Sequence, residues 1–127
     1  MGNKYLISVD QSTQGTKALL FSEKGELCAR ADLAHRQIVN EQGWVSHDGE
    51  EIYQNTMQVI RNVLEREQVS PEDVAGIGIS NQRETAIMWD RETGQPLDHA
   101  VVWQCARAAE ICERKEIQEM AEQVRLR

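Results

Sequence analysis

The chain has 127 residues and a formal net charge of −7, from 21 acidic and 14 basic side chains. This length suits one domain with one core. Nucleic acid and membrane surfaces are disfavoured as partners, because both need a positive face and the basic residues are scattered among acidic ones. No run of about 18 apolar residues and no signal-peptide core is seen, so we expect a cytoplasmic protein.

The first part of the sequence predicts three strands. Residues 4–9, 16–21 and 26–35 are rich in β-forming residues or alternate between apolar and polar side chains. A polar loop separates the first two segments, and the turn dipeptide Lys24-Gly25 precedes the third. Because connections this short join antiparallel neighbours, we expect an antiparallel meander.

The middle of the sequence predicts one helix. Asp48 and Glu51 have the spacing of a capping box, in which each side chain satisfies a backbone N–H at the helix start. The helix should end near Gln68, before Pro71. Its apolar stripe is formed by residues at steps of three and four: Ile52, Thr56, Val59, Ile60 and Val63.

The remaining segments predict a strand, a hairpin and a second helix. Residues 74–80 are short and apolar, which is typical of a strand buried on both faces. A turn-rich segment separates residues 85–89 from 100–103, which indicates a β-hairpin or a pair of short strands. Residues 104–124 carry apolar side chains on a helical period. This order predicts an α/β fold with a mixed sheet and flanking helices.

Cysteines and histidines indicate no metal site. The cysteines form no C-x-x-C pair, and two of them on the last helix would lie about 10 Å apart along its axis. We therefore expect three buried free thiols at Cys28, Cys105 and Cys112. The histidines have no metal-ligand spacing, so we expect them on the surface: His35, His47 and His99.

The polar segment DQSTQGTK, residues 10–17, follows the first predicted strand. Its hydroxyls, the positive Lys17 and Gly15, which lets backbone N–H groups approach an anion, suit a loop that binds phosphate. Asp10, at the strand end, could hold Mg²⁺ through water. The alternative is an ordinary hairpin turn, because the same residue types are common in turns.

A second polar segment, NQRET, follows the strand predicted at residues 74–80. Arg83 can donate hydrogen bonds to the hydroxyls of a small polar substrate and Glu84 can accept them. The alternative is a solvated, salt-bridged turn. Trp103 could add an aromatic wall beside the carbon chain of a polyol, with core packing as its alternative.

Four segments, residues 5–21, 43–53, 76–96 and 100–113, occur together at spacings that resemble the N-terminal part of the FGGY carbohydrate kinases. Among these, the NQRET form is most similar to the glycerol kinases and differs from the xylulose kinases. The loop departs from the usual glycerol kinase pattern at five positions, among them Ser12 in place of Gly and Lys17 in place of Arg.

The resemblance implies an actin-like, ribonuclease-H-like ATPase domain over residues 1–127. It implies a two-domain enzyme that transfers the γ-phosphoryl of ATP, with Mg²⁺, to a sugar or polyol, most closely glycerol, giving glycerol 3-phosphate. The matching phosphate-binding positions are Thr13, Gln14, Gly15 and Lys17. Asp10 matches the metal-associated aspartate, and the substrate-binding positions are Arg83, Glu84 and Trp103.

The family's catalytic aspartate and adenine-binding half would lie beyond residue 127. We therefore expect an inactive fragment whose exposed cleft wall favours homo-oligomers. A second hypothesis is a non-catalytic actin-like module that binds a polyol or a partner protein. A third is an acid-base hydrolase that uses Asp10 and Glu84.

Overall fold

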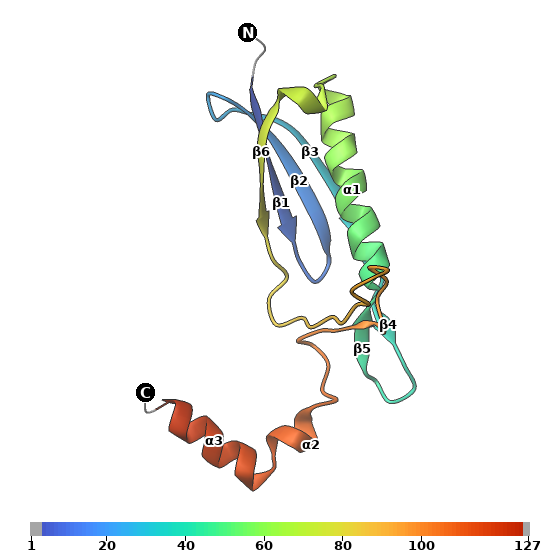
Figure 1. Ribbon diagram of the computed structural model, residues 1–127, viewed down its shortest axis with the longest axis vertical. Coiled ribbons are helices and arrows are strands. Elements are labelled where there is room, and N and C mark those ends of the chain that lie inside the picture. The colour runs from blue at the N-terminus through green and yellow to red at the C-terminus, as the bar shows by residue number, and fades with distance from the viewer. Residues whose placement is uncertain (1–3, 126–127) are drawn as a thin grey trace.

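The computed structural model describes residues 4–125 and contains a four-stranded mixed sheet (Figure 1). Its strands are β1 (Tyr5–Gln11), β2 (Gly15–Ser22), β3 (Leu27–Ala34) and β6 (Val74–Ser80). The order across the sheet is β3-β2-β1-β6. β2 is antiparallel to both β1 and β3, which confirms the meander, and β6 runs parallel to β1.

Helix α1 (Gly49–Arg66) begins where the capping signal predicts. The Asp48 carboxylate accepts hydrogen bonds from the backbone N–H groups of Glu50, at 2.9 Å, and Glu51, at 3.4 Å. The Glu51 carboxylate instead accepts from the backbone N–H and Nε of Arg36, at 3.2 and 3.1 Å. Glu51 therefore does not cap the helix as predicted; its carboxylate binds Arg36, in the segment after β3.

The core lies between α1 and one face of the sheet. Val59 and Val63 of α1 are fully buried, as the helical period predicts. They pack on alternate strand residues, whose side chains point to the face of the sheet that α1 covers. Strands and helix together bury eight hydrophobic residues in this cluster: Ile7, Val9, Ala18, Leu20, Ala29, Ala31, Val59 and Val63.

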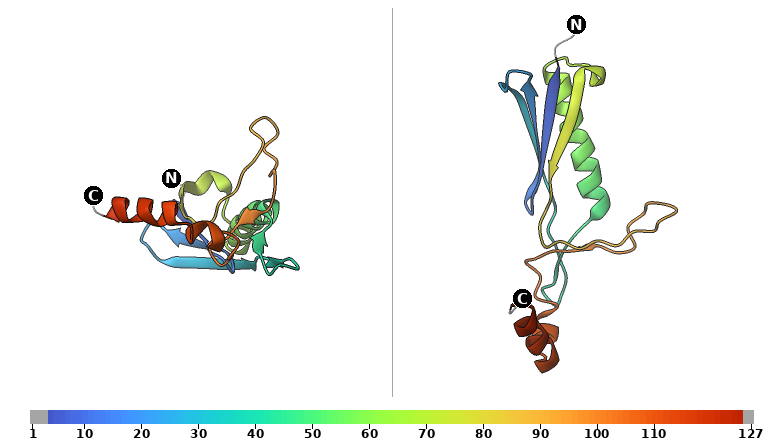
Figure 2. Two further views of the ribbon diagram at one scale, coloured as in Figure 1. Left: turned by 90° about the horizontal axis from the view of Figure 1, so that it is seen from below. Right: turned by 60° about the vertical axis from the view of Figure 1, so that its left-hand side comes forward.

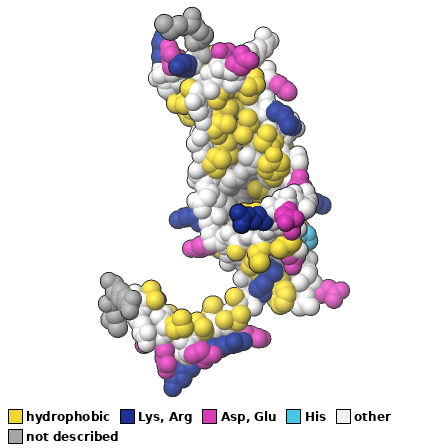
Figure 3. All heavy atoms as spheres, viewed as in Figure 1, with side chains coloured by type: hydrophobic (Ala, Val, Ile, Leu, Met, Phe, Trp, Pro, Cys, Tyr) yellow, Lys and Arg dark blue, Asp and Glu magenta, His cyan; other side chains and the backbone are white. Residues whose placement is uncertain are grey.

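Strand β6 forms where predicted, but the expectation that both of its faces are buried is wrong. Its pairing with Ile7 and Val9 places Ile77 and Ile79 on the face that α1 covers. However, α1 packs on β2 and β3, so Ile77 and Ile79 remain 51% and 66% exposed. The right view of Figure 2 shows the sheet with α1 behind it, and Figure 3 shows hydrophobic side chains gathered where β6 and α1 lie.

A second, smaller sheet has the order β4-β5-β7. It lies beyond the end of the main sheet at which β1 and β6 finish (Figure 1). Its strands are β4 (Ile38–Val39), β5 (Val45–His47) and β7 (Ala100–Val101). The predicted hairpin forms as an arm in which Ala86 and Val101 exchange two backbone hydrogen bonds of 2.9 and 2.8 Å. The sequence did not predict β4 and β5, because they are only two and three residues long.

The helix predicted over residues 104–124 is wrong as a single element. The chain forms α2 (Ala109–Cys112) and α3 (Lys115–Arg125), and residues 104–108, which precede them, are not helical. Both helices are without buried residues, so no packing stabilises one continuous helix. Among residues 4–125, no helix is both long enough and apolar enough to cross a bilayer.

The three cysteines are free, as predicted, but the expectation that they are buried is wrong. Cys28 and Cys105 are half-buried, and Cys112 is exposed on α2.

A single 3-10 turn, η1 (Pro71–Asp73), joins α1 to β6.

Candidate functional site

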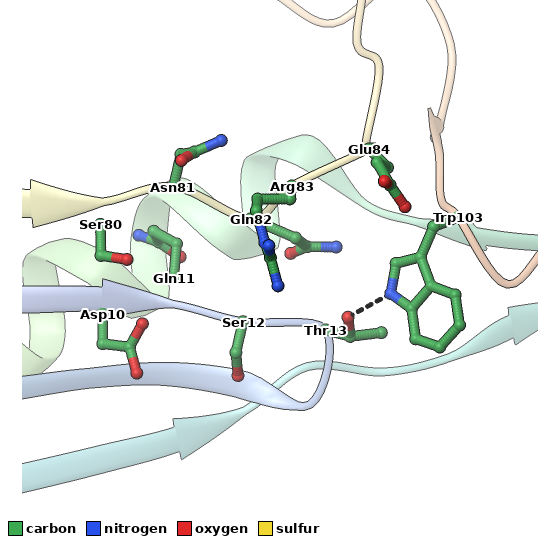
Figure 4. Close-up of a pocket in the computed structure, with 10 residues that line it drawn as sticks. All are labelled: Asp10, Gln11, Ser12, Thr13, Ser80, Asn81, Gln82, Arg83, Glu84 and Trp103. Atoms are coloured by element: carbon green, nitrogen blue, oxygen red, sulfur yellow. Dashed lines mark hydrogen bonds between the residues drawn. The ribbon is translucent and has the colours of Figure 1, made fainter.

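An open cleft of about 530 Å³ lies at the polar end of the main sheet. Figure 4 shows the side chains that line it, from the ends of β1 and β6, the loops that follow them and the segment after β7. One wall is formed by the end of β1 and the turn that follows, and the other by the end of β6 and the loop after it. The lining residues are Asp10, Gln11, Ser12, Thr13, Ser80, Asn81, Gln82, Arg83, Glu84 and Trp103.

Strand direction brings the two polar segments together. β1 and β6 are parallel neighbours, and Asp10 is paired with Ser80 near the carboxyl end of both strands. Carboxyl ends of adjacent parallel strands open at the same edge of a sheet, which is where ligands bind in open α/β folds. Residues about 70 positions apart in the sequence therefore lie side by side at this edge of the sheet.

The predicted phosphate-binding residues are divided between two neighbouring pockets. Thr13 lines the cleft, whereas Gln14, Gly15 and Lys17 line a second pocket of about 300 Å³. Asp10 lines both pockets. Lys17 is the register partner of Asp10 across β1 and β2, so the two side chains share the sheet face that α1 does not cover.

Gly15 is required for packing. The backbone N–H and the hydroxyl of Ser12 both donate to the Gly15 carbonyl oxygen, at 3.0 and 2.9 Å, and close a tight turn between β1 and β2. A Cβ atom at Gly15 would collide with the carbonyl oxygen of Leu33 and would lie 3.0 Å from Cα of Ala34. The close approach of β3 therefore excludes larger residues here.

The three predicted substrate-binding residues all line the cleft. Trp103 donates from Nε1 to the hydroxyl oxygen of Thr13 at 2.8 Å, and its side chain joins the wall from β1 to the segment after β7. Figure 4 shows the Arg83 guanidinium pointing toward the β1–β2 turn, with Glu84 beside Trp103. Trp103 is 56% exposed, so core packing does not account for it.

Glu84 has a backbone conformation that is uncommon for its residue type. Its φ of 55° lies in the left-handed region, where a side chain is unfavourable unless neighbouring structure holds it. The conformation turns the chain from the cleft wall into the arm, directly after Arg83.

The expectation of surface histidines is wrong for two of the three. His99 is exposed, but His35 is 7% exposed and His47 is fully buried. Each buried ring is satisfied by polar side chains from distant elements: His47 contacts Gln37 at 2.8 Å and Gln82 at 3.2 Å, while His35 contacts Thr16 and Asn55, both at 3.0 Å. No local sequence signal indicates partners so far apart.

Burial controls the protonation of these two histidines. It lowers the pKa of both His35 and His47 below the ordinary value of 6.5, because a charged ring is poorly solvated there. The two rings lie 6.0 Å apart, so a charge on His47 lowers the pKa of His35 further. Both rings are therefore neutral at pH 7.

The part of the chain between residues 4 and 125 contains no group of three histidine, cysteine or acidic side chains that could hold a metal ion. Two carboxylates line the cleft, and Asp10 is the one at the end of β1, beside the second pocket, whereas Glu84 lies beside Trp103. A single carboxylate fits Mg²⁺, which keeps several waters and takes its other ligands from phosphate oxygens.

Comparison with known proteins identifies the family. Residues 5–127 match the N-terminal domain of the FGGY family of carbohydrate kinases. Glycerol kinase 1 of Thermotoga maritima is 46% identical over 109 residues, which are 86% of this chain and 22% of that protein. Glycerol kinase of Brevibacillus brevis is 42% identical over 125 residues, 98% of this chain and 25% of that protein. The chain thus spans about a quarter of these relatives.

Solved structures share the fold. A crystal structure of Plasmodium falciparum glycerol kinase with ADP superimposes with a TM-score of 0.75 and 35% identity, over 86% of this chain and 22% of that one. Gluconate kinase from Lactobacillus acidophilus gives 0.84 at 21% identity, over 97% of this chain and 24% of that one, which shows the fold alone. The actin-like α/β fold is confirmed, and the chain belongs to the FGGY family of carbohydrate kinases.

Proposed function

We propose that this chain provides the polyol-binding wall and the phosphate loop of an ATP-dependent kinase that converts glycerol to glycerol 3-phosphate. The observation that carries the proposal is the convergence of Arg83, Glu84 and Trp103 on one cleft with Thr13. The relatives named glycerol kinases support the choice of glycerol within the family.

The three side chains have complementary roles toward a polyol. The Arg83 guanidinium donates hydrogen bonds to hydroxyl oxygens, and the Glu84 carboxylate accepts hydrogen bonds from the hydroxyl groups. Trp103 provides a flat apolar surface for the carbon chain. Because its indole nitrogen is already bonded to Thr13, the ring is held in place before the substrate arrives.

The adjacent pocket suits the phosphate side of the reaction. Lys17 supplies a positive charge, and Gln14 and Gly15 supply polar groups beside it. Asp10 lies between this pocket and the cleft, where its carboxylate would hold Mg²⁺ through water. When bound, Mg²⁺ neutralises charge on the transferring phosphoryl group.

Phosphoryl transfer requires groups on every side of the γ-phosphate. We propose that the catalytic base and the adenine site are supplied by polypeptide beyond residue 127, since the chain spans about a quarter of its relatives. The exposed Ile77 and Ile79 support this, because an apolar edge of this kind is typical of a surface that packs against further structure. The three free cysteines support a cytoplasmic location, because disulfides are rare there.

Titration of glycerol into this chain, followed by NMR, tests the proposal without ATP. Glycerol should shift the indole signal of Trp103 and the Nε signal of Arg83 in a saturable way. Arg83→Ala should abolish the saturable shift at Trp103, whereas Arg61→Ala, an exposed arginine on α1, should retain it. Equal responses in the Arg83→Ala variant and the unmodified chain, or no response in either, would contradict the proposal.

A second measurement separates a kinase from a binding module. A longer polypeptide that includes this chain should form glycerol 3-phosphate from glycerol and MgATP. Glycerol binding without product would support the non-catalytic module instead.

A further inference from the structure

Strand β5 is three residues long, and its His47 is hydrogen-bonded to Gln82, one of the residues that line the cleft. It lies in the segment 43–53, which is part of the family resemblance but has no role in the proposed chemistry. Ser46 pairs with Val101 and His47 pairs with Ala100. Both partners belong to β7, which ends two residues before Trp103. β5 therefore sets the position from which Trp103 enters the cleft.

His47 connects β5 to the two loops that form the cleft. Its Nε2 donates to Oε1 of Gln37 at 2.8 Å, and Nε2 of Gln37 donates to the backbone carbonyl of Thr13 at 3.0 Å. Its Nδ1 accepts from Nε2 of Gln82 at 3.2 Å. Gln82 directly precedes Arg83, so one buried ring is linked to the turn after β1 and to the loop after β6.

The orientations of the two glutamine side chains match one tautomer of the neutral ring. With a proton on Nε2 and none on Nδ1, His47 requires an oxygen from Gln37 and an N–H from Gln82. Nε2 of Gln82 also donates to the hydroxyl of Thr85 at 3.0 Å, while its Oε1 is buried without a partner in the described structure. The amide therefore takes the orientation that His47 and Thr85 require.

A second contact fixes β5 from the other side. The Arg107 guanidinium donates to the carbonyl oxygen of Val45 at 3.0 Å and to the Ser46 hydroxyl at 2.6 Å, and it lies 5.1 Å from the ring centre of Trp44. Since Arg107 follows Trp103 by four residues, the segment that carries Trp103 is held to β5 both before and after the tryptophan.

We propose that His47 is a positioning residue that holds Thr13, the Arg83–Glu84 loop and Trp103 in the arrangement that binds the substrate. This inference rests on the proposed function for its ligand. It differs from a purely structural role, because it requires that the polar contacts of His47 control the geometry of the cleft in protein that remains folded.

The Trp103 indole N–H reports that geometry without any ligand. Thr13→Val removes the hydroxyl that accepts its hydrogen bond and gives the NMR position of the unbonded indole. In His47→Leu, which loses both polar contacts, we expect the Trp103 indole signal to move at least halfway to that position. Val63→Ala, which removes core packing away from the cleft, should destabilise the fold and leave the signal unchanged.

Two conservative variants test the two contacts of His47 separately, and they carry the test alone should His47→Leu fail to fold. His47→Gln places an N–H near the position of Nε2 and should retain the indole signal through Gln37 and Thr13. His47→Asn places an oxygen near the position of Nδ1 and should retain the contact to Gln82 while the indole signal moves. An indole signal that is unchanged in both His47→Leu and His47→Asn would overturn the inference.

Glycerol titration of the same variants separates this inference from the proposed function. The folded His47→Leu chain should bind glycerol at least tenfold more weakly than the Val63→Ala chain. Absence of glycerol binding by the unmodified chain would count against the proposed function alone, because the indole signal tests the positioning role without a ligand. Equal glycerol affinity in His47→Leu and Val63→Ala would overturn the positioning role.

Discussion

The packed half, residues 4–80, and the open half, residues 81–125, are built differently. The packed half holds all eight members of the core cluster, whereas the buried hydrophobic residues of the open half are Ala100 and Val102. The cleft lies between the halves and takes residues from both: Asp10 and Thr13 from one, and Arg83, Glu84 and Trp103 from the other. The core holds Asp10 and Thr13 in place, but it does not hold Arg83, Glu84 and Trp103. The position of these three residues depends on hydrogen bonds to β5.

The largest expected effect separates the two halves by their stability. Leu20→Ala in the packed half should lower the free energy of unfolding by about 2 to 5 kcal/mol, because Leu20 is fully buried in the core. Leu97→Ala in the open half should change it by less than about 0.5 kcal/mol, because Leu97 is 61% exposed. Urea unfolding measures both variants. Similar losses would show that the halves do not differ as described.

A smaller effect is expected at the start of α1. Asp48→Ala should lower the free energy of unfolding by about 1 kcal/mol, since two backbone N–H groups lose their acceptor. Asp48→Asn should retain most of the stability. Glu92→Ala, at an exposed acidic residue in the open half, provides the control and should have little effect. Thermal unfolding of the three variants is the measurement, and equal melting temperatures would contradict the role of Asp48 as the helix cap.

Acidification should lower the free energy of unfolding through His35 and His47, which are buried near the cleft between the two halves. Because the folded pKa of His35 and of His47 is lowered, the unfolded chain binds protons first as the pH falls below 6.5. Stability from these neutral rings is complete above pH 6.5 and is lost as the pH falls through the lowered folded pKa. Glu51 opposes the shift at both rings.

Urea unfolding at pH 7.5 and 5.5 measures this loss. His47→Gln should reduce this pH dependence, because it removes one of the two buried rings whose pKa is lowered. Equal stability of the unmodified chain at the two pH values would argue against buried neutral histidines in the folded state.

The smallest stability change is expected at the uncovered edge of the packed half. Ile79→Thr should alter the free energy of unfolding by less than about 0.5 kcal/mol, because Ile79 is 66% exposed. The same substitution should reduce self-association, since it interrupts the apolar edge. Light scattering should give the unmodified chain a mass above 14.5 kDa and the variant a mass nearer that value. A monodisperse 14.5 kDa monomer of the unmodified chain would count against the expected homo-oligomer.

Local signals explain which parts of the structure could be predicted. The meander, the start of α1 at Asp48 and the buried stripe around Val59 follow from alternation, capping and period within short segments. The two polar segments were recognised from their residue types. The sequence did not show that β6 would place both on one edge beside Trp103, although the family resemblance implied a shared site.

The errors arose where distant contacts decide the outcome. The burial of His47 depends on Gln37 and Gln82, which lie 10 and 35 residues away. The exposure of Ile79 depends on how far α1 extends across the sheet, which periodicity does not indicate. The split between α2 and α3 reflects the absence of packing against either helix in the described structure.

The hydrogen bond between Trp103 and Thr13 also bears on the order of folding. The meander is joined by short turns, but this bond spans 90 residues. Closing a long loop costs conformational entropy before its contacts can form, and distant contacts slow folding. We therefore expect the three antiparallel strands to form early and the cleft to assemble late.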